Sequence, residues 1–82
     1  MKIKNVNNYI GYNISECLYQ KRKSQSWLAQ KCGVSKSHIN QIVKGKVNPS
    51  ISLLTSISKT LEIDVNAIVS PPLEKKFLKG ND

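Results

Sequence analysis

One stretch, residues 24–46, constrains the fold of this chain more than any other, because it carries two apolar patterns separated by a glycine. Leu28, Ala29 and Cys32 recur at the spacing of one helical face. After the break at Gly33, a second set recurs at spacings of three and four residues, namely Ile39, Ile42 and Val43. The stretch therefore predicts two short helices joined by a tight turn, with both apolar faces directed inward and Ser24 as the N-cap of the first helix.

The residues between the two predicted helices suit such a turn. Gly33 can adopt a positive φ and so end the first helix, and Ser35 is a candidate N-cap for the second. The outward side of the second helix carries donors and amides and no acid, at Lys36, Ser37, Asn40, Gln41 and Lys44. Because such a face suits base edges and phosphates, we predict a helix-turn-helix that binds DNA through residues 36–44.

The charge of the chain agrees with this prediction. The 82 residues carry a formal net charge of +8, which favours a polyanionic partner, nucleic acid first and an anionic membrane surface second. No acid occurs between Gln20 and Pro49, and the five acids lie outside, at Glu16, Glu62, Asp64, Glu74 and Asp82. Lysines that only kept a small protein soluble would be interspersed with acids, so the pattern favours nucleic acid.

Several other classes of function find little support. Cys17 and Cys32 form no C-x-x-C pair and occupy apolar helical positions, so we expect reduced core residues and no metal site. His38 has no second histidine to complete a metal or catalytic site, and a chain this short has no room for a buried catalytic cavity. We expect no enzyme, no cofactor, no secretory signal and no membrane span, and hence a soluble cytoplasmic protein.

The rest of the chain divides into three parts. We expect a flexible N-terminal arm, a helical DNA-binding domain and a basic C-terminal tail, over residues 1–8, 9–70 and 71–82. A first helix is predicted from Tyr9 to about Lys23, and the basic run at its end suits either the helix dipole or a phosphate. Trp27 is more typical of half-buried packing than of ligand contact.

Two more helices are predicted after the loop at Pro49. The fourth helix begins at Ser50 or the next residue, and its inward stripe is expected at Ile51, Leu54, Ile57, Ser58 and Leu61. Asp64 is a candidate N-cap for a short fifth helix, whose apolar residues continue the core.

The run from Ile10 to Val69 resembles the DNA-binding domain of phage repressors, Cro proteins and XRE-type regulators. The matching residues are Ile10, Gly11, Ile14, Ser24, Gln25, Leu28, Ala29, Gly33, Val34, Ser35, Ile39, Gly45, Asn48, Pro49, Ser50, Leu54, Leu61, Ile63 and Ile68. The resemblance implies an all-α, five-helix λ-repressor-like fold with its third helix in the major groove. Two features depart from the pattern. Leu18 and Val43 stand where many family members pair an arginine with a glutamate, and the joint change to apolar residues is compatible with the fold. Glu62 replaces the usual glycine after the fourth helix; because a left-handed non-glycine residue costs about 1 kcal/mol, we expect this helix to end differently.

The resemblance also implies individual roles. Base edges would be read by Lys36, Ser37, Asn40 and Gln41, with Lys36 suited to guanine and Gln41 to adenine. Gln25 would hold a phosphate and brace Lys36, the first recognition residue. Further phosphate contacts are expected from Ser24, Ser35, His38, Lys44, Lys46 and Asn48.

These roles imply a sequence-specific transcriptional regulator, most simply a homodimeric repressor on an operator with two-fold-related half-sites about 34 Å apart. Dimer contacts are expected from the fifth helix and the tail, at Ile63, Val65, Ile68, Val69 and Phe77. The alternative is an antitoxin or protein-interaction module, whose tail binds a partner protein while its helix-turn-helix binds their shared promoter.

Overall fold

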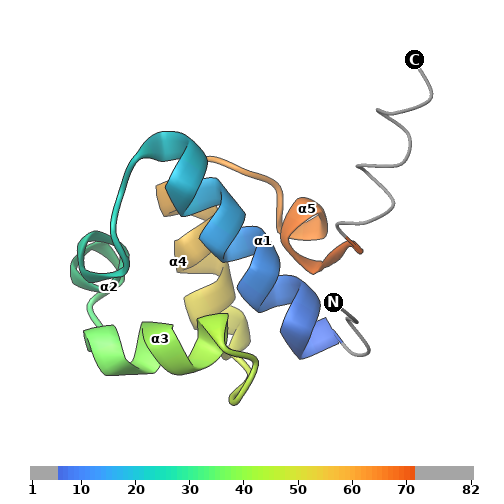
Figure 1. Cartoon of the computed structure of the whole chain (residues 1–82), viewed down its shortest axis with the longest axis horizontal. Coiled ribbons are helices and arrows are strands. Elements are labelled where there is room, and N and C mark those ends of the chain that lie inside the picture. The colour runs from blue at the N-terminus through green and yellow to red at the C-terminus, as the bar shows by residue number, and fades with distance from the viewer. Residues whose placement is uncertain (1–5, 72–82) are drawn as a thin grey trace.

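The computed structural model describes residues 6–71, which form five helices and, over that range, no strand (Figure 1). The helices are α1 (Val6–Lys21), α2 (Gln25–Cys32), α3 (Lys36–Val43), α4 (Ile51–Leu61) and α5 (Val65–Val69). The predicted all-α, five-helix architecture is confirmed. None of the helices in this range is long and apolar enough to cross a membrane.

The two ends of α1 differ from the prediction. The helix begins at Val6, ahead of the expected start at Tyr9, so that residues 6–8 of the predicted arm are helical. It ends at Lys21, before the expected end near Lys23. The predicted arm before residue 6 and the predicted tail after residue 71 lie outside the described residues.

Side chains cap the starts of the other four helices, as predicted. The oxygens of Ser24, Ser35 and Ser50 each accept a hydrogen bond from the backbone N–H three residues later, at 3.0–3.1 Å. Asp64 accepts from the backbone N–H of Asn66 at 2.8 Å. Each cap satisfies one otherwise unpaired donor of a helix end and contributes about 1 kcal/mol. The helix starts therefore follow from local sequence.

The C-terminal ends of α1 to α4 share one geometry. Each is followed by a residue with positive φ, at Arg22 (58°), Gly33 (72°), Gly45 (77°) and Glu62 (59°). The next backbone N–H donates back to a carbonyl of the last turn, as from Lys23 to Leu18 at 2.9 Å and from Val34 to Ala29 at 3.0 Å. This pattern is the Schellman motif, which satisfies carbonyls that a helix end leaves unpaired.

The expected departure at Glu62 is wrong, because α4 ends in the same left-handed cap without a glycine. The Ile63 N–H donates to the Ser58 carbonyl at 3.1 Å, and the Ser58 hydroxyl donates to the Ile63 carbonyl at 2.6 Å. Ile63 is also half-buried against the core. These contacts after the cap hold Glu62 in a conformation that its own side chain disfavours.

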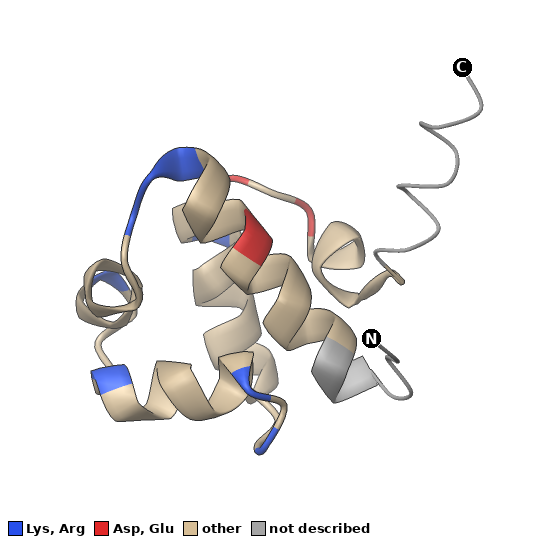
Figure 2. Cartoon of the chain, viewed as in Figure 1, with Lys and Arg blue, Asp and Glu red and all other residues tan. Residues whose placement is uncertain are grey.

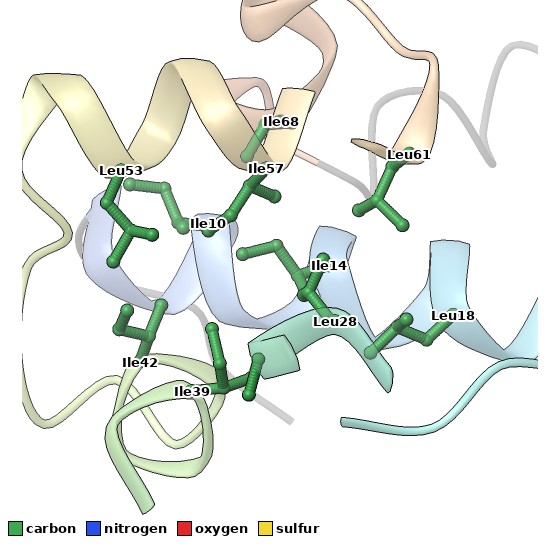
Figure 3. Packing of buried hydrophobic residues seen from close by; sticks show 11 residues of the cluster. Ile10, Ile14, Leu18, Leu28, Ile39, Ile42, Leu53, Ile57, Leu61 and Ile68 are labelled. Carbon is green, nitrogen blue, oxygen red and sulfur yellow. The ribbon is translucent and has the colours of Figure 1, made fainter. Parts of the chain in front are cut away.

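One apolar core joins all five helices. α1 packs against α3 and α5, α2 packs against α3 and α4, and α4 packs against α5. The core side chains, ten of which are labelled in Figure 3, are Ile10, Ile14, Leu18, Leu28, Ala29, Ile39, Ile42, Leu53, Ile57, Leu61 and Ile68.

The inward stripe of α4 is confirmed at Leu54, Ile57 and Leu61 but includes Leu53 in place of the predicted Ile51. Leu53, Ile57 and Leu61 are buried at a spacing of four, whereas Ile51 is 84% exposed. Ile51 is the first residue of α4, directly after the cap at Ser50, and the helix turns its side chain to solvent there. The apolar pattern alone allowed two neighbouring faces, and packing against α2 and α5 selects between them.

Two contacts place α1 against its neighbours. A Cβ at Gly11 would lie 2.8 Å from the Ile42 carbonyl oxygen and would also meet the Val43 carbonyl, so only glycine allows this approach of α1 to α3. At the other neighbour, the buried Asn13 donates from Nδ2 to the carbonyls of Ile68 at 2.6 Å and Ser70 at 2.9 Å. Asn13 thus ties the last turn of α5 to α1, and sequence reasoning did not single it out.

Candidate nucleic-acid interface

The outer side of α3 is the candidate interface. Ile39 and Ile42 are 0% and 1% exposed, so they fix which side of α3 faces the core. Lys36, Ser37 and Gln41 are exposed, as predicted for residues that would meet a groove. In Figure 1, α3 lies along the lower edge of the molecule and α2 packs beside it. The two helices form the predicted helix-turn-helix.

The acids of the described range lie away from this side, whereas basic residues occur both here and at the end of α1, on α2 and on α4 (Figure 2). Lys36 stands at the start of α3, and the exposed Lys44 and Lys46 stand after its end. Helices α2 and α3, which are described in full, contain no acid, while the acids in the described range lie on α1 and between α4 and α5. A positive potential on the α3 side attracts a polyanion.

A hydrogen bond joins the start of α2 to the middle of α3 in a way that the resemblance did not imply. Asn40 donates from Nδ2 to Oε1 of Gln25 at 3.1 Å. The expected brace between Gln25 and Lys36 is therefore wrong, because the Gln25 side chain reaches the residue one turn further along α3. Asn40 is half-buried and its amide is engaged, in contrast to the exposed Gln41. Only helix packing brings residues 25 and 40 together, so the sequence gives no local signal for this pair.

The residues expected to touch phosphates lie around α3. Ser24 and Gln25 stand at the start of α2, and Ser35 at the start of α3, where both serine oxygens already accept cap bonds. His38 is half-buried on α3. Past its other end the exposed residues are Lys44, Lys46 and Asn48. Their contact with DNA stays a prediction.

The corner between α1 and α2 is also basic. Lys21, Arg22 and Lys23 are exposed there, and the Lys23 ammonium lies 5.1 Å from the centroid of the Trp27 ring. Trp27 is half-buried against the core, as its predicted packing role requires. A cation over the face of an indole ring is attracted by the ring quadrupole, which orients Lys23.

The residues expected at a dimer interface are only partly available. Ile68 is 0% exposed, so this expectation is wrong: its surface is already used within the core of the chain. Ile63, Val65 and Val69 are half-buried, and Phe77 lies outside the described residues.

The two cysteines are free and half-buried, in agreement with the prediction of packed thiols. Burial raises the pKa of the Cys17 thiol above its ordinary value, while the nearby Lys21 opposes the shift. A protonated thiol is a poor nucleophile and a poor metal ligand, which agrees with a packing role.

The fold and the exposed side of α3 define a helix-turn-helix domain. The chain belongs to the helix-turn-helix family HTH_3, whose sequence model matches residues 16–68. This match covers the last six residues of α1, all of α2, α3 and α4, and α5 as far as Ile68, and so contains the whole candidate interface.

Known proteins with similar sequences are regulators. The chain is 33% identical over 69 residues to the HTH-type transcriptional regulator SinR of Bacillus subtilis (strain 168), covering 83% of this chain and 62% of SinR. It is 33% identical over 60 residues to the immunity repressor protein of Bacillus phage phi105, covering 73% of this chain and 42% of that protein. The chain thus spans less than two thirds of each of these relatives.

A solved structure has the same fold. The hypothetical transcription factor NHTF from Neisseria superposes with a TM-score of 0.82 over 90% of this chain and 85% of NHTF, at 22% sequence identity.

Proposed function

We propose that this chain is a sequence-specific DNA-binding transcriptional regulator that acts as a repressor in the cytoplasm and has no enzymatic activity. One observation carries the proposal: the core side of α3 is fully buried, which leaves an acid-free row of amide, hydroxyl and ammonium groups on its exposed side. Those groups match the donor and acceptor patterns of the major groove. Membership of the helix-turn-helix family and the names of the relatives support the same function.

The geometry favours a division of roles within the interface. Lys36, Ser37 and Gln41 are exposed on α3, and we assign them to base edges. Asn40 is set apart from them because its amide is bonded to Gln25. Phosphate contacts are assigned to the residues around the helix, namely Ser24, Gln25, Ser35, His38, Lys44, Lys46 and Asn48. Such contacts position the domain and carry no sequence information directly.

A homodimer on a two-fold-related operator completes the proposal. The recognition helix has eight residues, which reach only a few base pairs, and paired helices about 34 Å apart would read successive major grooves. The half-buried Ile63, Val65 and Val69, together with Phe77, are the residues proposed for dimer contacts. Sedimentation of the free protein and of its DNA complex would test this, and one protomer per operator would contradict it.

The test of DNA reading compares two duplexes of equal length, the DNA upstream of the protein's own coding sequence and a random sequence, each at two salt concentrations. Phosphate contacts weaken steeply with salt, whereas discrimination between sequences comes from base contacts. We expect a preference for the upstream duplex that persists at the higher salt. Equal binding to both duplexes, lost as salt rises, would contradict a sequence-reading regulator of its own promoter.

A further inference from the structure

The hydrogen bond between Asn40 and Gln25 has a direction that bears on DNA binding. Asn40 supplies an N–H and Gln25 supplies its oxygen, so the Gln25 Nε2 group keeps both of its hydrogens. Within the described part of the chain, Nε2 has no hydrogen-bond partner. Phosphate oxygens only accept hydrogen bonds and therefore need an N–H donor. The Gln25 Nε2 group, which Asn40 leaves unbonded, is such a donor.

The bond also limits the freedom of a long side chain. A glutamine has three rotatable bonds, and fixing such a side chain on binding lowers affinity by roughly two- to tenfold. Asn40 lies on a helix that is held by the buried Ile39 and Ile42, so it offers a rigid anchor. Lys36, which lacks this contact, is exposed and keeps its freedom at the start of α3.

We propose that Asn40 is a positioning residue, which holds the Gln25 amide with its N–H groups toward one operator phosphate; this inference rests on the proposed function. The pair links a backbone contact on α2 to the helix that enters the groove. A shift of α3 relative to α2 would break the bond, so the phosphate contact depends on the correct seating of the recognition helix. Asn40 acts through Gln25 and is distinct from the base-reading residues Lys36, Ser37 and Gln41.

The experiment replaces single operator phosphates with neutral methylphosphonates and measures the affinity of the full chain for each duplex. The relevant phosphate is the one whose replacement lowers the affinity of the natural protein for the duplex but hardly changes the affinity of Gln25→Ala. A hydrogen bond to a charged group accounts for roughly tenfold in affinity, so we expect a loss of that size for the natural protein. For Asn40→Ala we expect the loss to fall to roughly threefold or less, since Gln25 must then be ordered on binding.

A second variant tests the direction of the amide. In Asn40→Asp the carboxylate has no N–H and accepts from Gln25 Nε2, which turns the Gln25 oxygen toward the phosphate. Replacement of that phosphate should then leave affinity unchanged or raise it. Gln41→Ala is the matched control on the same helix: it should bind the operator more weakly and keep the full sensitivity to the methylphosphonate. Circular dichroism verifies that all variants keep their helix content.

The outcomes separate the two proposals. If Asn40→Ala and Asn40→Asp both lose as much affinity on methylphosphonate replacement as the natural protein does, the positioning role is overturned and the DNA-reading function stays intact. Operator binding without any phosphate that depends on Gln25 would do the same. If the natural protein shows no preference for its operator over random DNA, the proposed function fails, and this inference fails with it.

Discussion

Gln41 on the exposed side of α3 and Lys44 directly after the end of that helix are three residues apart, yet they offer DNA different chemistry. The amide of Gln41 can donate and accept at once, which matches the N7 and N6 groups of adenine. We expect Gln41→Ala to lose about 1–3 kcal/mol of binding free energy on the operator and little on random DNA. Fluorescence anisotropy titrations with both duplexes measure the difference, and an equal loss on both would show that Gln41 reads no base.

Lys44 presents a mobile point charge at the end of α3, where it suits a phosphate and no particular base. Lys44→Ala should weaken binding to operator and random DNA by the same factor. It should also reduce the slope of log affinity against log salt by about one, because one fewer counterion is released. A loss confined to the operator would instead assign Lys44 to base reading.

Among the helices, the end of α4 offers a way to stabilise the domain. Glu62 adopts φ 59°, which glycine tolerates better, and its carboxylate lies at the negative end of the helix dipole. Glu62→Gly should raise the free energy of unfolding by about 1 kcal/mol, measured by urea denaturation. Lys59→Gly, inside the same helix, is the control and should lower it by about 1 kcal/mol. A destabilised Glu62→Gly would mean that the Glu62 side chain makes a contact that stabilises the cap.

Where α1 crosses α3, by contrast, we expect that replacing a glycine destabilises the domain. An alanine in the middle of a helix ordinarily stabilises relative to glycine, but a Cβ at Gly11 would collide with the carbonyls of Ile42 and Val43. We expect Gly11→Ala to lower the free energy of unfolding by about 1–3 kcal/mol, seen as a lower melting temperature. Ser15→Ala, at an exposed position on α1, should be neutral or stabilising. Equal behaviour of the two variants would refute the close contact.

The sequence predicted those features of the helices that depend on neighbouring residues in the chain. The caps at Ser24, Ser35, Ser50 and Asp64 and the break at Gly33 follow from residues close in sequence, and the structure confirms them. Other features depend on packing between helices. The exposure of Ile51, the left-handed Glu62 and the bond between Gln25 and Asn40 each require knowledge of a neighbouring element, which periodicity does not supply.

At the scale of the whole domain, Asn13 connects α1 to α5, the first and last helices of the described range. Its amide donates to two carbonyls at the end of α5, which would otherwise need another hydrogen-bond donor. Asn13→Ala should lower the free energy of unfolding by about 1–3 kcal/mol, because it leaves a buried carbonyl unpaired. In this variant, the backbone amides of α5 should exchange their hydrogens faster than in the natural protein, and the increase should be larger in α5 than in α3. Asn66→Ala, an exposed change on α5, is the control, and equal effects of the two would argue against the link.

The contact made by Asn13 also has a consequence for synthesis of the protein. Its two partners lie 55 and 57 residues later in the chain. A ribosome that adds 5–20 residues per second needs roughly 3–11 seconds to cover that interval. During this time α1 has no C-terminal helix to cover it, and its buried amide has no native acceptor. The contact between α1 and α5 can therefore form only after α5 has left the ribosome, later than any contact between α1 and α3.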